Sequence, residues 1–413
     1  MLKRFRTVKR TLYIILAAVL FLTACTTGDG VQQSDIQRAV AFVANMPGEG
    51  ETTRAANVID DTDALKQETG FGVFGCYTGL HKYLDSNVHP DFMYNEHVSW
   101  GKWEDDTDDW GYSPLKYWPN GEGETYASLI TGENPHYVSF MAYAPYTSST
   151  SSCIYRFSKQ GDKGDPWLEY RLAPIVDNQV DLLYALPLLD EKKRTNGERL
   201  LFTFNHALAC VGDRISINLC EEYISGLLGN LEKQPSATSI EVLINNVSVE
   251  YTLTEEGRLV LWNDKADPNW HPVTDGTPIT TRKLSWTVEP SQQIYYYDKS
   301  TLTGTPTDWV KTGEGVFYIP KQFGTTPQTV KLTVNYTVII NGQNKAQNNY
   351  EISTTFKLSD YPNGYQAGKH LYIEAHICSE VEQPELTGLL IDGMLMSKKD
   401  WGENTQDHEV YNW

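Results

Sequence analysis

The residues with the most specific chemistry lie at the N-terminus, where a cysteine follows a short apolar run. Five Lys and Arg residues within positions 3–10 precede an apolar run over residues 12–22, and the sequence Leu-Thr-Ala-Cys ends at Cys25. The apolar run is about half of the roughly 20 residues that a membrane-spanning helix needs, which is typical of a cleaved export signal. Small residues before a cysteine are typical of a bacterial lipobox, in which the chain is cut just before the cysteine. We therefore predict that residues 1–24 are a lipoprotein signal peptide and that Cys25 carries lipid in the form of diacylglycerol.

Other residues that could do chemistry give weaker patterns. Residues 104–109 place five carboxylates between two tryptophans and could hold Ca²⁺ through oxygen ligands, but the run lacks the glycine and terminal glutamate spacing of an EF-hand. His370 and His376 are six residues apart on a predicted strand, too far apart to share a metal ion. The sequence has no G-x-S-x-G, H-E-x-x-H, P-loop or G-x-G-x-x-G motif. We therefore expect no enzyme, no metal site and no cofactor.

The charge balance is acidic. The chain of 413 residues has 53 Asp and Glu against 34 Lys and Arg, a formal net charge of −19. Binding of DNA or RNA through phosphates requires clustered Lys and Arg, so nucleic acid is excluded as a partner. An acidic surface is also repelled by anionic lipid headgroups, so attachment to the membrane rests on the lipid at Cys25. The polar residues 26–35 are typical of a flexible tether between membrane and body.

Five cysteines follow Cys25 without regular spacing. They are Cys76, Cys153, Cys210, Cys220 and Cys378. An odd number without a C-x-x-C pair indicates small buried apolar residues more than a disulfide framework. Cys210 and Cys220 form the candidate pair, because they are ten residues apart and could face each other across a hairpin. The spacing leaves open whether any disulfide forms.

Alternation of apolar and polar residues predicts strands along most of the chain. Apolar residues at every second position over 330–340, Asn-Gly at 341–342 and a return run over 352–358 predict a long hairpin. Shorter runs of the same kind lie at residues 202–208, 215–219, 240–244 and 371–377. Residues 221–233 differ, because their apolar residues fall at helical spacing with acids in the first turn. They predict one short amphipathic helix.

These elements predict a mostly β fold. Many strands and few helices indicate two tandem β-sandwich domains with one short helix. The polar stretch 190–198 separates two strand-rich halves. We place the N-terminal β-sandwich domain at residues 56–197 and the C-terminal one at residues 198–413.

Five segments carry a resemblance that spans roughly residues 36–378. They are residues 110–120 (Trp-Gly-Tyr-Ser-Pro-Leu-Lys-Tyr-Trp-Pro-Asn), 138–146, 202–209, 316–322 and 368–373. In this order they resemble the fimbrillin, or type V pilin, family of surface lipoproteins from Gram-negative anaerobes. The resemblance implies β-sandwich domains of transthyretin-like, Greek-key type, the second opened by residues 202–209. It also implies that the lipid at Cys25, with palmitate, lies in the outer membrane. It further implies a shaft or tip subunit of a surface fimbrium that mediates adhesion, with other fimbrial subunits as partners and a host or bacterial surface ligand.

The resemblance further implies a mechanism of assembly. In this family a trypsin-like protease cuts the lipidated precursor after an Arg just beyond the first strand, and a C-terminal strand of the next subunit fills the groove that opens. Residues 40–43 form a short apolar run, and Arg54-Ala55 follow a loop. The candidate processing site is therefore Arg54 with Ala55 as the new N-terminus, and residues 25–55 hold the lipidated tether and the removable first strand. Arg38 is the second candidate, although cleavage there would leave the strand attached.

Two regions leave alternatives open. Residues 34–45 could form a helix capped by Ser34 or Asp35, whereas the apolar run 40–43 is equally a short strand. A helix would not serve as a removable strand. The region 378–413 is longer and more polar than a plain donor strand, with apolar runs only at 389–391 and 394–396. If neither run can leave its own sheet, the protein is a tip or accessory subunit.

The rival function is that of a monomeric outer-membrane lipoprotein that binds glycans through exposed Trp and Tyr. The chain has 11 Trp and 25 Tyr, and aromatic rings on exposed loops stack on sugar rings. Trp118, Tyr143 and Tyr146, however, sit in apolar alternating runs, where packing in a core is about twice as probable as ligand binding.

Overall fold

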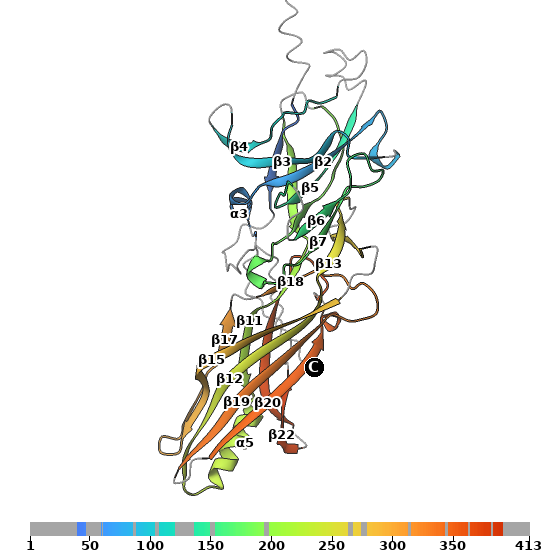
Figure 1. Ribbon diagram of the computed structural model, residues 1–413. Helices are drawn as coiled ribbons and strands as arrows, with labels where there is room; N and C mark the ends of the chain where they lie inside the picture. Colours follow the sequence, from blue (N-terminus) through green and yellow to red (C-terminus); the bar gives the residue numbers. More distant parts are fainter. Residues whose placement is uncertain are drawn as a thin grey trace, which may run out of the picture.

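The alternating apolar runs form strands that pack into four sheets, and the molecule that results is elongated (Figure 1). The computed structural model describes residues 39–46, 59, 61–85, 88–103, 107–119, 136–148, 153–193, 198–262, 267–273, 279–312, 315–342, 346–361, 364–380 and 383–390. Figure 1 shows the long strands of the C-terminal half at one end and the sheet that holds β2, β3 and β5 at the other. The predicted mostly β fold is confirmed.

Two sheets form the N-terminal part of the molecule. The larger runs in the order β1 (Phe42–Asn45), β10 (Leu200–His206), β8 (Leu183–Ala185), β5 (Tyr137–Ala144), β2 (Phe71–Gly79), β3 (Met93–Lys102) and β4 (Asp108–Gly111), with β9 (Leu188–Glu191) beside β5. The smaller runs β14 (Asn269–His271), β13 (Glu256–Val260), β7 (Trp167–Arg171) and β6 (Ile154–Phe157). Met141 of β5 packs with Leu168 and Leu259 of the smaller sheet, whereas Phe140 packs in a second core on the opposite face. Both faces of β5 are buried, which explains why the strand is apolar at successive positions from Phe140 to Ala144 instead of alternating with polar residues.

The C-terminal part is a sandwich around one core. One sheet runs β17 (Trp309–Thr312), β11 (Ala209–Leu219), β21 (His370–Glu380) and β22 (Gln383–Leu390), with β18 (Val316–Tyr318) beside β11. The other runs β16 (Thr303–Pro306), β15 (Ile279–Asp298), β12 (Ala237–Thr254), β19 (Thr329–Gly342) and β20 (Ala346–Lys357). The predicted hairpin is confirmed, because β19 and β20 pair antiparallel from Thr329 with Lys357 to Ile340 with Ala346.

Helices are few in the described part of the chain. The predicted amphipathic helix is confirmed as α5 (Glu221–Glu232), which buries Tyr223, Leu227 and Leu231 against the C-terminal core. A second helix that the sequence did not predict, α3 (Thr62–Gln67), begins where the Asp61 carboxylate accepts a hydrogen bond from the Ala64 amide. Three short 3₁₀ helices are η1 (Tyr83–Asp85), η2 (Val176–Asn178) and η3 (Leu358–Asp360). None of the helices described is long and apolar enough to span a membrane.

The chain does not pass from the N-terminal sheets to the C-terminal sheets at the predicted boundary near residue 198. Strand β10 follows that boundary, yet it lies between β1 and β8 in the N-terminal sheet, and β13 pairs with β7. Residues 202–206, expected at the opening of the second domain, therefore belong to the first sheet, and the C-terminal sandwich begins with β11 at Ala209. The division into domains 56–197 and 198–413 stays a prediction, and the pairings of β10 with β8 and of β13 with β7 cross its boundary.

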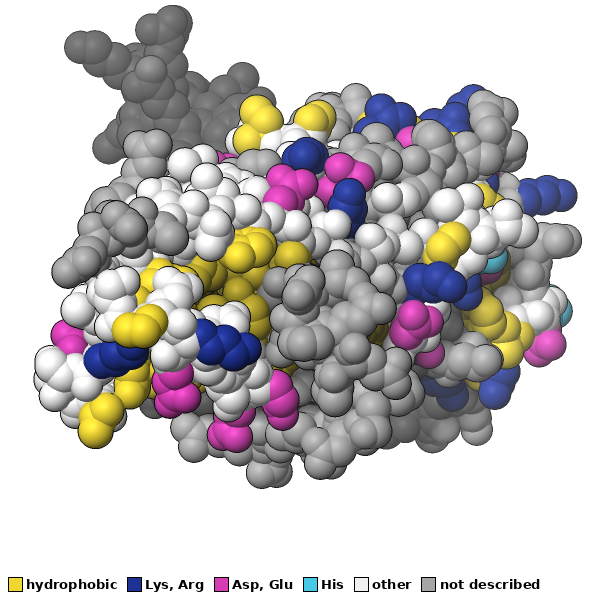
Figure 2. Space-filling view, turned by 90° about the horizontal axis from the view of Figure 1, so that it is seen from below, with side chains coloured by type: hydrophobic (Ala, Val, Ile, Leu, Met, Phe, Trp, Pro, Cys, Tyr) yellow, Lys and Arg dark blue, Asp and Glu magenta, His cyan; other side chains and the backbone are white. Residues whose placement is uncertain are grey.

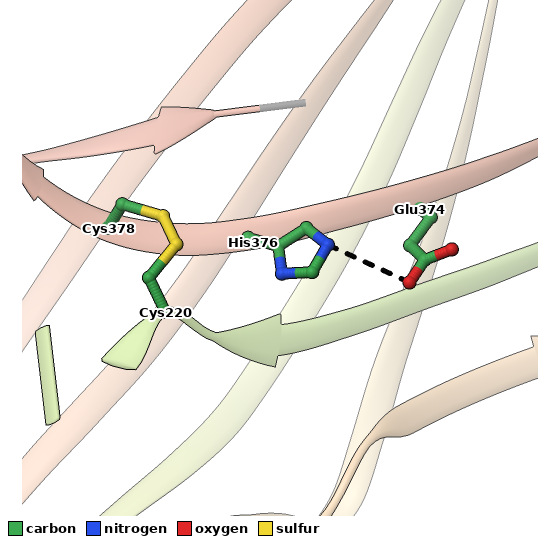
Figure 3. Close-up of a disulfide and its surroundings, with 4 residues drawn as sticks. All are labelled: Cys220, Glu374, His376 and Cys378. Atoms are coloured by element: carbon green, nitrogen blue, oxygen red, sulfur yellow. Dashed lines mark ion pairs between the residues drawn. A yellow bond between two sulfur atoms is a disulfide. The ribbon is translucent and has the colours of Figure 1, made fainter. Parts of the chain in front are cut away.

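The disulfide differs from the candidate pair. Cys220 bonds to Cys378, with Cα atoms 5.0 Å apart, whereas Cys210 is buried and free (Figure 3). The reason is the topology: β11 and β21 are parallel neighbours with Leu219 opposite Ile377, so the next residue of each strand brings the two sulfur atoms together. Cys210 instead lies at the start of β11, opposite His370, and so far along the strand that it cannot face Cys220.

Candidate functional site

The residues predicted as a removable first segment form an edge strand. Of the two structures open for residues 34–45, the described part takes the extended one: β1 runs over Phe42–Asn45, and Ala39 makes an isolated bridge before it. The side chains at alternate positions point into the core, and Val40, Phe42, Ala44 and Met46 are all buried. Those between them are half-buried or exposed. One face of this short segment is therefore part of the core, although it joins the sheet at its edge.

Phe42 is the centre of the buried face. Its side chain is 1 % exposed, and its ring lies 5.4 Å from that of Phe140, 5.5 Å from Phe202 and 5.8 Å from Tyr112, measured between centroids. These rings come from β5, β10 and the segment after β4, so removal of Phe42 would leave an aromatic-lined groove between three elements. A buried Phe stabilises a fold by several kcal/mol.

Backbone hydrogen bonds hold both sides of the same segment. On one side β1 pairs parallel with β10, from Phe42 with Leu200 to Asn45 with Thr203. On the other side the Val40 amide donates to the Lys116 carbonyl at 2.8 Å, and Ala39 bridges Tyr117. We call residues 112–117 the flanking segment. The segment is therefore held by main-chain hydrogen bonds, the interaction from which strand addition obtains its affinity.

Tyr112 fixes the flanking segment to the strand. Its hydroxyl donates to the Val40 carbonyl at 2.8 Å and accepts a hydrogen bond from the Lys116 amide at 3.2 Å. Burial raises the pKa of Tyr112 to about 12, against a smaller lowering from the hydrogen bond to Lys116. The hydroxyl thus stays protonated, and can donate, over the whole physiological range of pH. Tyr112 lies in one of the segments that resemble the fimbrillin family, but the sequence predicted no role for it. Its hydrogen-bond partner, Val40, lies 72 residues away in the chain.

The chain is anchored again beyond the predicted processing site. The Met46 amide donates to the Thr62 hydroxyl at 3.1 Å, and the Ile59 amide donates to the Asp181 carboxylate at 3.1 Å. The same carboxylate oxygen lies 2.9 Å from Nδ1 of His206 in β10. Cys25, Arg54 and Ala55 lie outside the described residues, but Arg54-Ala55 falls in sequence between these two anchored points. A cut there would separate β1 from a body that keeps its own anchor at Ile59.

Asp109, the last residue of the acidic run, and the tryptophans on either side of the run line a pocket. Residues 104–106 lie outside the described residues, and Asp109 forms an ion pair with Arg199. The described part of the chain contains no group of three or more side chains able to hold a metal ion. A pocket of about 550 Å³ is lined by Trp103, Trp110, Asp109 and Leu115, among others.

The aromatic residues weighed for glycan binding lie mostly in the core. Trp118 and Tyr143 are buried, which confirms their prediction as core residues. Tyr146 is half-buried and stacks on the His97 ring, with centroids 3.9 Å apart.

Strand β22 belongs to the C-terminal arm, by which we mean residues 379–413, and lies toward the other end of the molecule (Figure 1). Among the described strands, β22 is at the edge of its sheet and pairs with β21. The disulfide fixes the end of β11 to β21, close to where the arm begins (Figures 1 and 3). Seen from below, this end shows charged side chains of both signs around a hydrophobic area (Figure 2). The sheet that contains β1 is at the opposite end in Figure 1.

Comparison with known proteins supports the resemblance seen in the sequence. No family model matches the chain. Over 164 residues the chain is 29 % identical to the fimbrium subunit Fim1C of Phocaeicola vulgatus, and this match covers 37 % of the chain and 38 % of that curated relative's length. The fold is similar to that of a fimbrial protein from Bacteroides vulgatus, with a TM-score of 0.56 and 19 % identity over 86 % of this chain and 98 % of the other. The predicted resemblance to fimbrial proteins is thus confirmed, in part of the sequence and in the fold.

Proposed function

We propose that the chain is a subunit of a surface fimbrium, a structural and adhesive protein without catalytic activity, and that it assembles by exchange of a strand between copies. The observation that carries the proposal is β1, an edge strand that inserts Phe42 between three aromatic rings and pairs with β10. The residues just before it, Ala39 and Val40, are joined to the flanking segment on the other side. A short segment with these contacts can be replaced by another extended segment, because backbone bonds and alternate side chains supply most of what holds it.

The position of the arm supports a head-to-tail polymer. The sheet with β1 and strand β22 lie toward opposite ends of the molecule (Figure 1). A contact between two different surfaces of identical chains repeats from copy to copy, and it builds a filament when the rotation between copies does not close a ring. In this proposal Cys25 is the lipidated residue, the lipid holds the precursor in the outer membrane, and cleavage after Arg54 frees the groove. The surface ligand for adhesion belongs to the same proposal.

The pocket at Trp103 and Trp110 favours the second candidate function, a monomeric glycan-binding lipoprotein. Its volume of about 550 Å³ and its lining of indole rings with the Asp109 carboxylate suit a sugar, which combines an apolar face with hydroxyl groups. This function needs no cleavage and no second copy.

The test is N-terminal sequencing of surface-sheared protein made in its native envelope, with an unboiled gel run alongside. The proposal expects an N-terminus at Ala55 and a ladder of polymers. Arg54→Ala should abolish both, whereas Arg38→Ala, the matched control upstream of β1, should leave both unchanged. Cys25→Ser should remove the lipid. A blocked, lipidated Cys25 with a single band would overturn the polymer and favour the glycan binder.

A further inference from the structure

The groove that holds β1 accepts only a particular pattern of side chains. Its four inward positions are occupied by Val40, Phe42, Ala44 and Met46, so the third position takes a small residue and the others take larger apolar ones. The intervening positions are half-buried or exposed and accept polar residues. Because a slip of one residue exchanges the two faces of a strand, this pattern fixes the register of any replacement.

Two segments of the C-terminal arm match this pattern of inward side chains when the arm runs in the same direction as β1. From residue 379 to the end, just two sets of four alternate residues are free of polar side chains and have a small residue in third place. The first set is Pro384, Leu386, Gly388 and Leu390, and the second is Leu389, Ile391, Gly393 and Leu395. The two sets place opposite faces of the arm in the groove.

The flanking segment decides between them. The first inward position, that of Val40, uses its amide to donate a 2.8 Å hydrogen bond to the Lys116 carbonyl. In the first set this position is Pro384, which has no N–H and would leave that carbonyl without its donor. In the second set the position is Leu389, near the end of β22, whose amide can donate in the same way once Leu389 and Leu390 leave their pairing with β21.

We propose that residues 389–395 of a second copy replace β1, with Leu389 at the position of Val40, Ile391 at that of Phe42, and Gly393 at that of Ala44. Leu395 then takes the position of Met46, and Leu390, Asp392 and Met394 face outward. The charged side chain thus falls on the half-exposed side, where Val43 lies in this structure. This inference rests on the proposed function and names the segment and the register that the function needs.

The proposed donor segment does not fill the groove completely at the position of Phe42. Ile391 is smaller than Phe42, so the space between the rings of Tyr112, Phe140 and Phe202 is less completely filled after the exchange. An aromatic residue at position 391 should therefore strengthen the assembly. The Ala44 position is the opposite case, because a large residue at 393 would have to enter a space that holds a methyl group.

The experiment uses the full chain, made in its native envelope and sheared from the surface, with polymers measured on unboiled gels. Ile391→Asp should reduce the ladder about tenfold or more, because it buries a charge among aromatic rings, whereas Leu390→Asp, the matched control on the other face, should stay within about twofold of wild type. Ile391→Phe should give at least the wild-type ladder, and Gly393→Phe should abolish it without adding a charge. Monomer yield and thermal unfolding of each variant control for folding.

The outcomes separate this inference from the proposed function. A wild-type ladder that Leu390→Asp abolishes and Ile391→Asp preserves overturns the register in favour of the set at 384–390. A wild-type ladder that none of the four variants alters places the exchanged strand elsewhere and overturns the inference alone. A wild-type chain that is cut at Ala55 but forms no ladder overturns the proposed function, and the inference with it.

Discussion

The Tyr112 hydroxyl donates a hydrogen bond of 2.8 Å to the carbonyl oxygen of Val40 and so joins the flanking segment to the first strand of the body. Val40 in turn donates from its amide to the carbonyl of Lys116. The segment that we propose to be removed is thus held by a small closed set of buried hydrogen bonds, in addition to its pairing with β10.

Replacement of Tyr112 by Phe should loosen this segment. The change leaves the Val40 carbonyl without its donor but keeps the ring that packs on Phe42, so we expect a loss of about 1–2 kcal/mol in the free energy of unfolding. Urea unfolding of the full chain measures the loss. Tyr117→Phe is the matched control, because the Tyr117 side chain is 48 % exposed. Equal stability of Tyr112→Phe and wild type would show that the hydroxyl contributes nothing to holding the strand.

Truncation of Phe42 should have a larger effect. Phe42→Ala removes a ring buried among three others, and such a cavity lowers the free energy of unfolding by about 3–5 kcal/mol. Asn45→Ala in the same strand removes an exposed side chain and should change it by less than about 0.5 kcal/mol. The two variants compared by urea unfolding tell whether β1 is part of the cooperative core. A loss below about 1 kcal/mol for Phe42→Ala would contradict that role.

Sequence patterns predicted the elements that depend on local residues. The hairpin of β19 and β20 and the helix α5 each carry enough alternating or helical repeats to define their type. β1 has only four residues, and four apolar or mixed residues fit a strand and a helical turn equally well. The extended structure of this segment depends on its partners, β10 and the flanking segment, which lie far away in the sequence.

Contacts between distant segments were beyond the reach of the same reasoning. The partner of Cys220 is 158 residues away, and only the parallel pairing of β11 with β21 brings Cys378 beside it. The Tyr112 hydrogen bond depends on a similar crossing of chain segments. The helix α3 was not predicted for another reason. It has six residues and buries only Leu65, so it shows no periodic pattern of apolar residues.

Loss of the disulfide should destabilise the C-terminal sandwich. A bond between residues 158 positions apart restricts the unfolded chain, and its removal typically lowers the free energy of unfolding by about 2–4 kcal/mol. We expect this loss for Cys220→Ala combined with Cys378→Ala, measured by urea unfolding without reductant. Cys76→Ala is the control for loss of a buried free thiol, because burial raises the pKa of Cys76 to about 12 and keeps it out of disulfide exchange.

The gel mobility of the same variants checks the pairing. Wild type should run faster without reductant than with it, and the double variant should run the same in both conditions. A mobility shift that survives in the double variant would mean that another pair of cysteines is bonded.

The pH dependence of stability should report on Glu169, a carboxylate of β7 between two arginines. Its side chain is fully buried, and it accepts hydrogen bonds from Arg156 at 2.5 Å and from Arg258 at 2.7 Å. Burial by itself opposes ionisation, but the hydrogen bonds and charges of both arginines outweigh it and hold the pKa of Glu169 below its ordinary value of 4.5. The Arg258 guanidinium also lies 4.0 Å from the ring centroid of Trp167, so β6, β7 and β13 meet at this group.

The sign of the effect follows from the lowered pKa. A carboxylate that is more acidic in the folded state stabilises the fold above the pKa of the unfolded chain, and this stability is lost as pH falls through the lower, folded value. Glu169→Gln should therefore be less stable than wild type by about 1.5–3 kcal/mol at neutral pH, and the difference should shrink below about pH 4.5 as the wild-type carboxylate takes up a proton. Thermal unfolding from pH 7 to pH 3 measures it. Glu232→Gln, at the exposed end of α5, should follow the wild-type curve, and a constant difference between Glu169→Gln and wild type over this range would contradict the ionised Glu169.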